Sequence, residues 1–295
     1  MHVWTSSAIS GLKGVARIPG DKSVSHRALM LGTLASGTTT ISGLLESDDV
    51  LRTARALISM GAIIFPPDHE SNAWRVEGGP LRNARGVLDL GNSGTSARLL
   101  MGLIGGQPVQ AVLTGDTSLQ RRPMGRVIKP LAQMGVHVEA TGGDKLPLRI
   151  YGAAQLRPIR YTLPVASAQV KSAIMLAALA ANGETIITEP VATRDHTERL
   201  LAYMGAAVVV DHGSDNVRRI HVTGQKSLAA QSIFVASDPS SAAFVTVAAL
   251  ITPDSDVMMP GVMINPLRAG LYTTLKEMGG DIAFDNVRER SGEPV

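Results

Sequence analysis

An internal repeat of about 72 residues constrains the fold of this chain more than any other feature. The segment PGDKSVSHR at residues 19–27 has echoes that begin near residues 91, 165 and 237, at offsets of 71, 145 and 217 residues. A second landmark recurs in the same phase, because helix-like segments end in Met-Gly at Met60, Met134, Met204 and Met278. Glycine directly after a helix is typical of a C-cap. Two series that keep step indicate four copies of one structural unit.

Each Met-Gly is followed by alternating apolar residues, which is typical of β-strands. The first three units show a complete hairpin, with the outgoing and returning strands AIIF and WRVEG, VHVEA and LPLRIYG, and AAVVVD and RRIHVTG. The fourth begins with DIAF and does not return. Between the two helices of each unit lies a further strand: TTTISG, AVLTG, ETIITEP or DVMMPG. The sequence therefore predicts an α/β fold built from internal repeats.

The repeat phase also predicts the domain organisation. Three complete units place a first domain at residues 18–236. Residues 1–17 and 237–295 are expected to form an incomplete second domain that holds the fourth unit. Because the sequence ends at Glu293, Pro294 and Val295, where the fourth return strand would begin, we expect a truncated polypeptide.

Composition narrows the classes of function. The 295 residues are 44% hydrophobic but only 3% aromatic, so few rings are present on which nucleobases can stack. The net charge is +3, but the sequence has no long run of Lys or Arg. This favours small anions over nucleic acid as ligands. The lack of Cys excludes disulfides, thiolate metal sites and a Cys nucleophile. With no signal-like N-terminus and no apolar stretch of about 20 residues, we expect a cytoplasmic protein that does not enter a membrane.

The motif PGDKSVSHR has the make-up of an anion-binding helix start. Asp21 or Ser23 can cap a helix that continues through the apolar run ALMLGTLA. Lys22, Ser23 and Arg27 would then join the free N–H groups and the positive end of the helix dipole in holding a phosphate or carboxylate. A capped helix with solvated charges explains the same residues, and the motif alone does not decide between the two.

Six motifs taken together do decide. PGDKSVSHR, LGNSGTSAR, LTGDTSLQRRPMGRVIKPLAQMG, PVASAQVKSA, TRDHTERL and SDPSSAAF closely resemble the 5-enolpyruvylshikimate-3-phosphate synthase family, in the same order and over essentially the whole chain. The Ser-Ala-Gln within VASAQVKSA is similar to the class II bacterial form. The resemblance implies a fold of two domains with three units each, so that four of six units are present here.

The resemblance further implies a reaction and its site residues. The family transfers the enolpyruvyl group of phosphoenolpyruvate to the 5-hydroxyl of 3-phosphoshikimate and releases phosphate, without a cofactor or metal and as a monomer. Both substrates are polyanions, which fits a site rich in Lys, Arg and N–H donors. By resemblance, 3-phosphoshikimate is held by Lys22, Ser23, Arg27, Ser167, Ala168, Gln169 and Arg194, and phosphoenolpyruvate by Lys22, Gly94, Arg122 and Gln169. Lys22 contacts both substrates and is the expected catalytic residue.

The family's other catalytic groups are expected beyond Val295. Its proton acceptor and its later Arg-containing motifs belong to the two units that this sequence lacks. We therefore expect little or no transferase activity from the chain alone. Glyphosate-tolerant class II members carry Ala at the position of Gly94, so a full-length enzyme with Gly94 is expected to be sensitive to this inhibitor.

Other polar residues are expected to have structural roles. We expect His26, Asp195 and His196 to be solvated or capping rather than catalytic or metal-binding. Asp238 is expected to cap a helix, and Asp48 to begin the helix that ends at Met60.

Two alternative functions remain. The UDP-N-acetylglucosamine enolpyruvyl transferases share the fold and the donor, but usually carry a reactive Cys and a different opening motif. A non-catalytic binder of anions or nucleic acid on the same repeat fits the positive net charge.

Overall fold

Three four-stranded sheets form the larger part of the molecule in the computed structural model, which describes residues 5, 7, 10–68, 71–153, 155–213, 217–224 and 227–295. In every sheet the first strand is parallel to the second, and the remaining neighbours are antiparallel. Their orders are β15(Ser232–Phe234)-β3(Thr38–Ser42)-β5(Ala73–Glu77)-β4(Ile63–Phe65), β6(Val87–Asp89)-β7(Gln110–Thr114)-β9(Lys145–Tyr151)-β8(His137–Thr141) and β10(Arg160–Thr162)-β11(Glu184–Glu189)-β13(Arg218–Thr223)-β12(Ala207–His212). Each of the first three repeat units was predicted to contain a strand and a hairpin, and each contributes these strands to one sheet.

The helices that carry the repeated start motif lie in the core. They are α1(Lys22–Leu34), α3(Gly94–Gly105) and α6(Ala168–Ala178), and their middle turns are buried on all sides. A helix that is apolar all round has no face suited to water, so it packs inside. The helices α2(Asp48–Ser59), α5(Gly125–Met134) and α7(His196–Tyr203) have one buried face each, and α4(Thr117–Gln120) is a single turn.

The Met-Gly landmarks end helices as predicted. The helices α2, α5, α7 and α9(Gly270–Glu277) stop within one residue of Met60, Met134, Met204 and Met278. The following glycines have φ angles of 95°, 107°, 85° and 92°. This left-handed conformation costs glycine little, which explains why the same dipeptide recurs in all four units.

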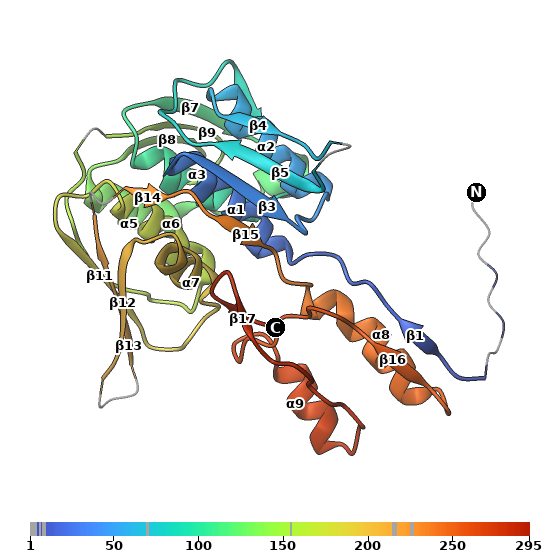
Figure 1. Cartoon of the computed structure of the whole chain (residues 1–295). Helices are drawn as coiled ribbons and strands as arrows, with labels where there is room; N and C mark the ends of the chain where they lie inside the picture. Colours follow the sequence, from blue (N-terminus) through green and yellow to red (C-terminus); the bar gives the residue numbers. More distant parts are fainter. Residues whose placement is uncertain are drawn as a thin grey trace.

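Residues 237–295 extend away from the three-sheet body (Figure 1). They contain α8(Pro239–Ile251), β16(Asp256–Met258), α9 and a short hairpin of β17(Glu289–Arg290) and β18(Glu293–Pro294). β1(Lys13–Val15) runs parallel to β16 and so joins the N-terminal residues to this extension, while β2(Ala35–Ser36) pairs with β14(Leu228–Ala229).

The end of the fourth unit differs from the prediction. The predicted strand DIAF is wrong, because residues 281–284 are not in a strand, and a strand forms only where another strand satisfies its backbone. The DIAF segment was expected to have no return strand within this sequence, and the residues up to Val295 do not pair with it. The backbone N–H of Val295 instead donates to the carbonyl of Arg288, and the N–H of Arg288 donates to the carbonyl of Val295, both at 2.9 Å. Val295 thus closes the short β17–β18 hairpin, in which a neighbouring segment satisfies its backbone.

The extension exposes large apolar side chains. Phe244 and Ile251 on α8 are 81% and 76% exposed, and Met278 at the end of α9 is 78% exposed. The division into a first domain at residues 18–236 and a second, incomplete domain stays a prediction. Within the described part of the chain, the helices are too short or too polar to cross a membrane.

Candidate active site

A cleft of about 420 Å³ lies between the start of α6 and the loop before α7. Ser167, Ala168 and Gln169 form one wall, and Ala192, Thr193 and Arg194 form the other, with Leu267 at the edge. Ser167 is the N-cap of α6 and accepts a hydrogen bond from the backbone N–H of Val170 at 3.4 Å. The structure thus brings four of the predicted site residues around one space.

Gln169 connects this cleft to the start of α3. Its Oε1 accepts a hydrogen bond of 2.8 Å from Nη1 of Arg98, and its Nε2 donates to Oγ1 of Thr95 at 3.0 Å. Arg98 was not predicted as a site residue, although it occupies the repeat position equivalent to Arg27. Its Nε is buried and has no hydrogen-bond partner among the residues that the structure describes. Burial lowers the pKa of Arg98, and the nearby Arg126 and Arg122 lower it further.

Two guanidinium groups lie over Gly94. A Cβ added to Gly94 would be 2.8 Å from Nη1 of Arg98 and 3.1 Å from Nη1 of Arg122. Nη2 of Arg122 donates to the side chains of Asn92 and Ser118. The N-terminus of α3 therefore places the positive end of a helix dipole beside two adjacent cations, an arrangement suited to a phosphate or carboxylate.

The opening motif forms a capped helix whose lysine is ion-paired. Asp21 is the N-cap of α1 and accepts from the N–H of Val24 at 2.9 Å. The Lys22 side chain is half exposed, and its Nζ lies 3.1 Å from Oδ2 of Asp49 in the first turn of α2. Ser23 is partly buried. An anionic ligand at Lys22 would compete with this carboxylate.

Arg27 is buried, with 3% of its surface exposed. Its Nε donates to Oγ1 of Thr197 at 2.6 Å, Nη1 to the carbonyl of Ser23 at 2.8 Å, and Nη2 to Oγ of Ser172 at 2.7 Å. Burial lowers the pKa of Arg27 to about 10, so it stays charged at neutral pH. The structure gives this predicted ligand contact a second role, the attachment of α1 to α6 and α7.

Burial also corrects the expectation for the histidines. His26 is fully buried and its Nδ1 lies 2.8 Å from Oγ1 of Thr53. Burial lowers the pKa of His26 to about 3, so the ring is neutral in the folded protein at pH 7. His196 is buried too, with Nδ1 2.7 Å from Oε1 of Glu293. Solvation was the wrong expectation for both, because their helices enter the core.

Asp195, His196 and Glu293 offer ligand atoms within 4.8 Å of one another, as a metal site would. Asp195 takes the N-cap position of α7, but its side chain makes no capping hydrogen bond. Nδ2 of Asn265 donates to Asp195 at 2.7 Å and to Glu293 at 2.9 Å. An amide N–H group turned towards both carboxylates opposes a cation between them, so this arrangement is a hydrogen-bond network. The predicted cap at Asp238 and the helix start at Asp48 are confirmed.

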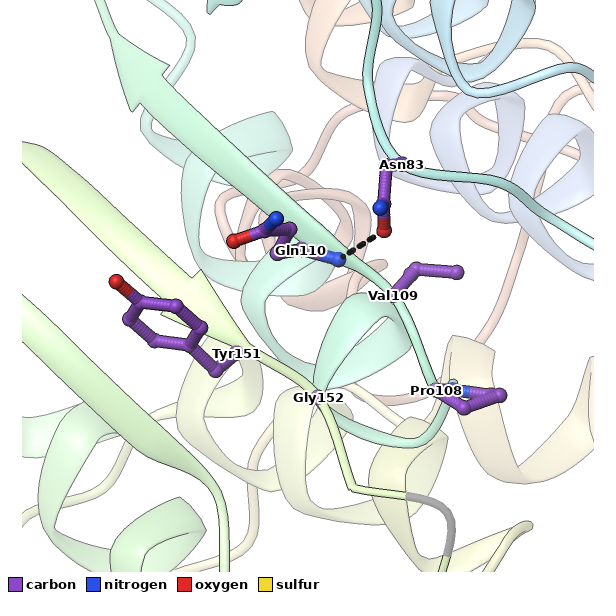
Figure 2. A pocket seen from close by; sticks show the side chains of 6 residues that line it. All are labelled: Asn83, Pro108, Val109, Gln110, Tyr151 and Gly152. Atoms are coloured by element: carbon purple, nitrogen blue, oxygen red, sulfur yellow. Dashed lines mark hydrogen bonds between the residues drawn. The ribbon is translucent and has the colours of Figure 1, made fainter.

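A second hollow of about 300 Å³ lies where the central strand β7 begins and its neighbour β9 ends. Figure 2 shows it lined by Asn83, Pro108, Val109, Gln110, Tyr151 and Gly152, with Oδ1 of Asn83 accepting from the backbone of Gln110. The lining holds no Lys, Arg or carboxylate, so it offers little to a polyanion.

Residues 7–293 match the model of the EPSP synthase family, described as 3-phosphoshikimate 1-carboxyvinyltransferase. The chain belongs to the EPSP synthase family. Its relatives include the 3-phosphoshikimate 1-carboxyvinyltransferases of Roseobacter denitrificans, 52% identical over 294 residues, and of Methylobacterium sp., 54% identical over 298 residues. Both alignments cover 99% of this chain, but 65% and 66% of the relatives.

The fold agrees with this family membership. A solved EPSP synthase from Acinetobacter baumannii is similar to the chain with a TM-score of 0.89 and 45% sequence identity, over 97% of this chain and 64% of that one. The predicted resemblance and the α/β fold class are confirmed. The chain spans just under two thirds of the length of the EPSP synthases it matches. The role of each site residue, the catalytic groups expected beyond Val295, the monomeric state and the cytoplasmic location stay predictions.

Proposed function

We propose that this chain supplies the cation-rich part of an enolpyruvyl transferase site, which holds 3-phosphoshikimate and phosphoenolpyruvate. The observation that carries the proposal is the cleft in which Ser167, Ala168 and Gln169 face Arg194. Both walls carry groups that bind anions, because the N-terminus of α6 offers free N–H groups and Arg194 offers a guanidinium. Family membership narrows these anions to the substrates of 3-phosphoshikimate 1-carboxyvinyltransferases.

The two substrates are assigned to neighbouring helix starts. 3-Phosphoshikimate occupies the cleft at α6, with its phosphate against Ser167 and Arg194. Phosphoenolpyruvate lies at the start of α3, where Gly94 leaves room beneath the guanidinium groups of Arg98 and Arg122. Gln169 hydrogen-bonds to Arg98 from the cleft side and therefore lies between the two subsites.

This arrangement lowers the repulsion between two polyanions and places the reacting groups side by side. Transfer also requires a proton on the methylene of phosphoenolpyruvate and a base for the attacking 5-hydroxyl. Apart from Arg194, the residues that line the cleft carry no ionisable side chain. We therefore infer that Lys22, which is half exposed beside Asp49, takes part in proton transfer, and that efficient turnover needs groups beyond Val295.

Calorimetric titration of the 295-residue chain with 3-phosphoshikimate tests the proposal. We expect binding that Arg194→Ala weakens about tenfold, as the loss of a charge-assisted contact does. Arg160→Ala is the matched control, because Arg160 is an exposed arginine on β10 that does not line the cleft. No heat of binding at millimolar ligand would refute the proposal, and binding of UDP-N-acetylglucosamine instead would favour the other enolpyruvyl transferases.

Phosphate release from both substrates tests the inference about turnover. We expect the chain alone to release phosphate far more slowly than a full-length relative. Equal rates would show that residues 1–295 already contain the acid and base groups.

A further inference from the structure

Four charged side chains are buried together behind the cleft. Lys171 of α6, Glu189 of β11, Glu198 of α7 and Arg218 of β13 are each less than a tenth exposed. Nζ of Lys171 lies 2.9 Å from Glu189 and 2.7 Å from Glu198, and Nη1 of Arg218 lies 3.2 Å from Glu189. Two cations thus face two carboxylates, and these four residues are called the buried ion cluster below.

Stability alone does not explain the buried ion cluster well, because removing four charges from water costs free energy. Burial raises the pKa of Glu198, and the adjacent Lys171 opposes that shift. Apolar residues of similar volume often replace a buried ion pair without loss of stability. A role in addition to stability therefore explains the cluster better, and its contacts indicate what that role is.

The buried ion cluster holds Thr193, which forms part of the cleft wall. The carbonyl of Thr193 accepts from Nη1 of Arg218 at 3.3 Å and from Nζ of Lys171 at 3.5 Å. The hydroxyl of Thr193 donates to Oε1 of Glu189. Three elements of the fold therefore fix the carbonyl and the hydroxyl of a single loop residue.

Lys171 joins the two walls of the cleft directly. Its backbone belongs to α6, two residues after Gln169, and its ammonium group reaches the carbonyl of Thr193 on the opposite wall. Arg194, the next residue, is exposed and lines the same cleft. The length of one buried lysine thus sets the separation between the start of α6 and the backbone that carries Arg194.

We propose that Lys171, Glu189 and Arg218 are positioning residues that hold Thr193, and through it Arg194, at the distance from Ser167 and Gln169 that an anionic ligand requires. The inference rests on the proposed function, which assigns Arg194 to 3-phosphoshikimate. The three residues keep Arg194 in place before the ligand arrives, so that the loop loses less conformational freedom when the ligand binds.

Thr193→Val tests this inference with a small change, since it removes the hydroxyl and keeps the branched shape. We expect about fivefold to tenfold weaker binding of 3-phosphoshikimate, because the hydrogen bond to a charged carboxylate is lost. Thr193→Ser retains the hydroxyl and should restore most of the affinity. Thr185→Val is the matched control, because Thr185 is a buried threonine on the same strand as Glu189 that does not line the cleft.

Two further measurements separate positioning from a general loss of stability. In a chain that already carries Arg194→Ala, Thr193→Val should cause no additional loss of affinity, because the two changes act through one contact. Hydrogen exchange, measured without ligand, should show faster exchange of the backbone amides of residues 192–194 in Thr193→Val than in Thr185→Val.

The inference is wrong if Thr193→Val and Thr185→Val have equal affinity, or if their exchange at residues 192–194 is equal. It is also wrong if the losses from Thr193→Val and Arg194→Ala add in full. Should the unaltered chain fail to bind 3-phosphoshikimate, the proposed function falls, while hydrogen exchange still decides whether the buried ion cluster holds this loop.

Discussion

Replacing Arg27 by Met tests whether this arginine is more than a ligand contact. The Arg27 guanidinium donates to Thr197, to the carbonyl of Ser23 and to Ser172 at 2.6–2.8 Å, and 3% of the residue is exposed. Methionine has a similar length and fills the space with apolar atoms. The variant therefore removes the charge and the hydrogen bonds and leaves little cavity.

The expected loss of stability is large for a single substitution. Removal of one member of a buried charged network costs about 3–5 kcal/mol. Ser172 and Thr197 remain hydrogen-bonded to each other at 2.7 Å, which keeps two of the former acceptors satisfied. We therefore take the lower end, about 3 kcal/mol, which corresponds to a fall in Tm of about 6–12 °C for a large domain.

Thermal unfolding measured by circular dichroism provides the test, with Arg194→Met as the matched control. The sequence assigns both arginines to the same substrate, but Arg194 is exposed, so its replacement should change Tm by less than about 2 °C. The reasoning is refuted if Arg27→Met unfolds within about 2 °C of the parent, or if both variants lose equal stability.

Three further changes have definite expected outcomes. Gly94→Ala should leave Tm within about 2 °C of the parent, because the added methyl group meets two movable guanidinium ends, but calorimetry should show weaker phosphoenolpyruvate binding. A large fall in Tm would show that these guanidinium groups cannot move. Gly102→Ala should cost about 3 kcal/mol in a denaturant titration, since the new Cβ would lie 2.1 Å from the backbone oxygen of Ala173, and an unchanged midpoint would contradict the close contact of α3 and α6. Burial lowers the pKa of His26 from 6.5 to about 3, so the unfolded chain binds this proton at higher pH than the folded protein, and stability should fall as pH decreases from 6.5 towards 3. His26→Gln should flatten that part of the pH dependence of Tm, and identical profiles for parent and variant would refute this explanation.

Local signals in the sequence predicted much of the fold. Helix ends at Met-Gly, N-caps such as Asp21 and Asp238, and alternating strands depend on neighbours within a few residues. Because these signals recur with a constant period, they also indicated the common unit. The family resemblance then supplied four of the residues that line the cleft, which are Ser167, Ala168, Gln169 and Arg194.

These local signals did not predict which strands pair when they lie far apart in the sequence. The first strand of each sheet, β6, β10 or β15, has only three residues, which is too short for a periodic pattern to mark it. β15 pairs with β3 from almost 200 residues away, with Ser232 opposite Thr40. The DIAF segment shows the converse, since a strand-like pattern without a partner strand is irregular in the structure.

The repeat explains why Arg27 and Arg98 differ although they carry the same signal. Ser172 stands at the position equivalent to Arg27 in the third unit, and the two side chains are hydrogen-bonded to each other. These two equivalent positions thus meet in the interior, where Arg27 finds its acceptors within the protein. Arg98 instead donates to Gln169 at the cleft, and its buried Nε has no partner in the described part of the chain. Arg27 and Arg98 therefore occupy equivalent positions in the repeat, and their different partners decide that Arg27 is bonded in the interior whereas Arg98 is bonded to a residue that lines the cleft.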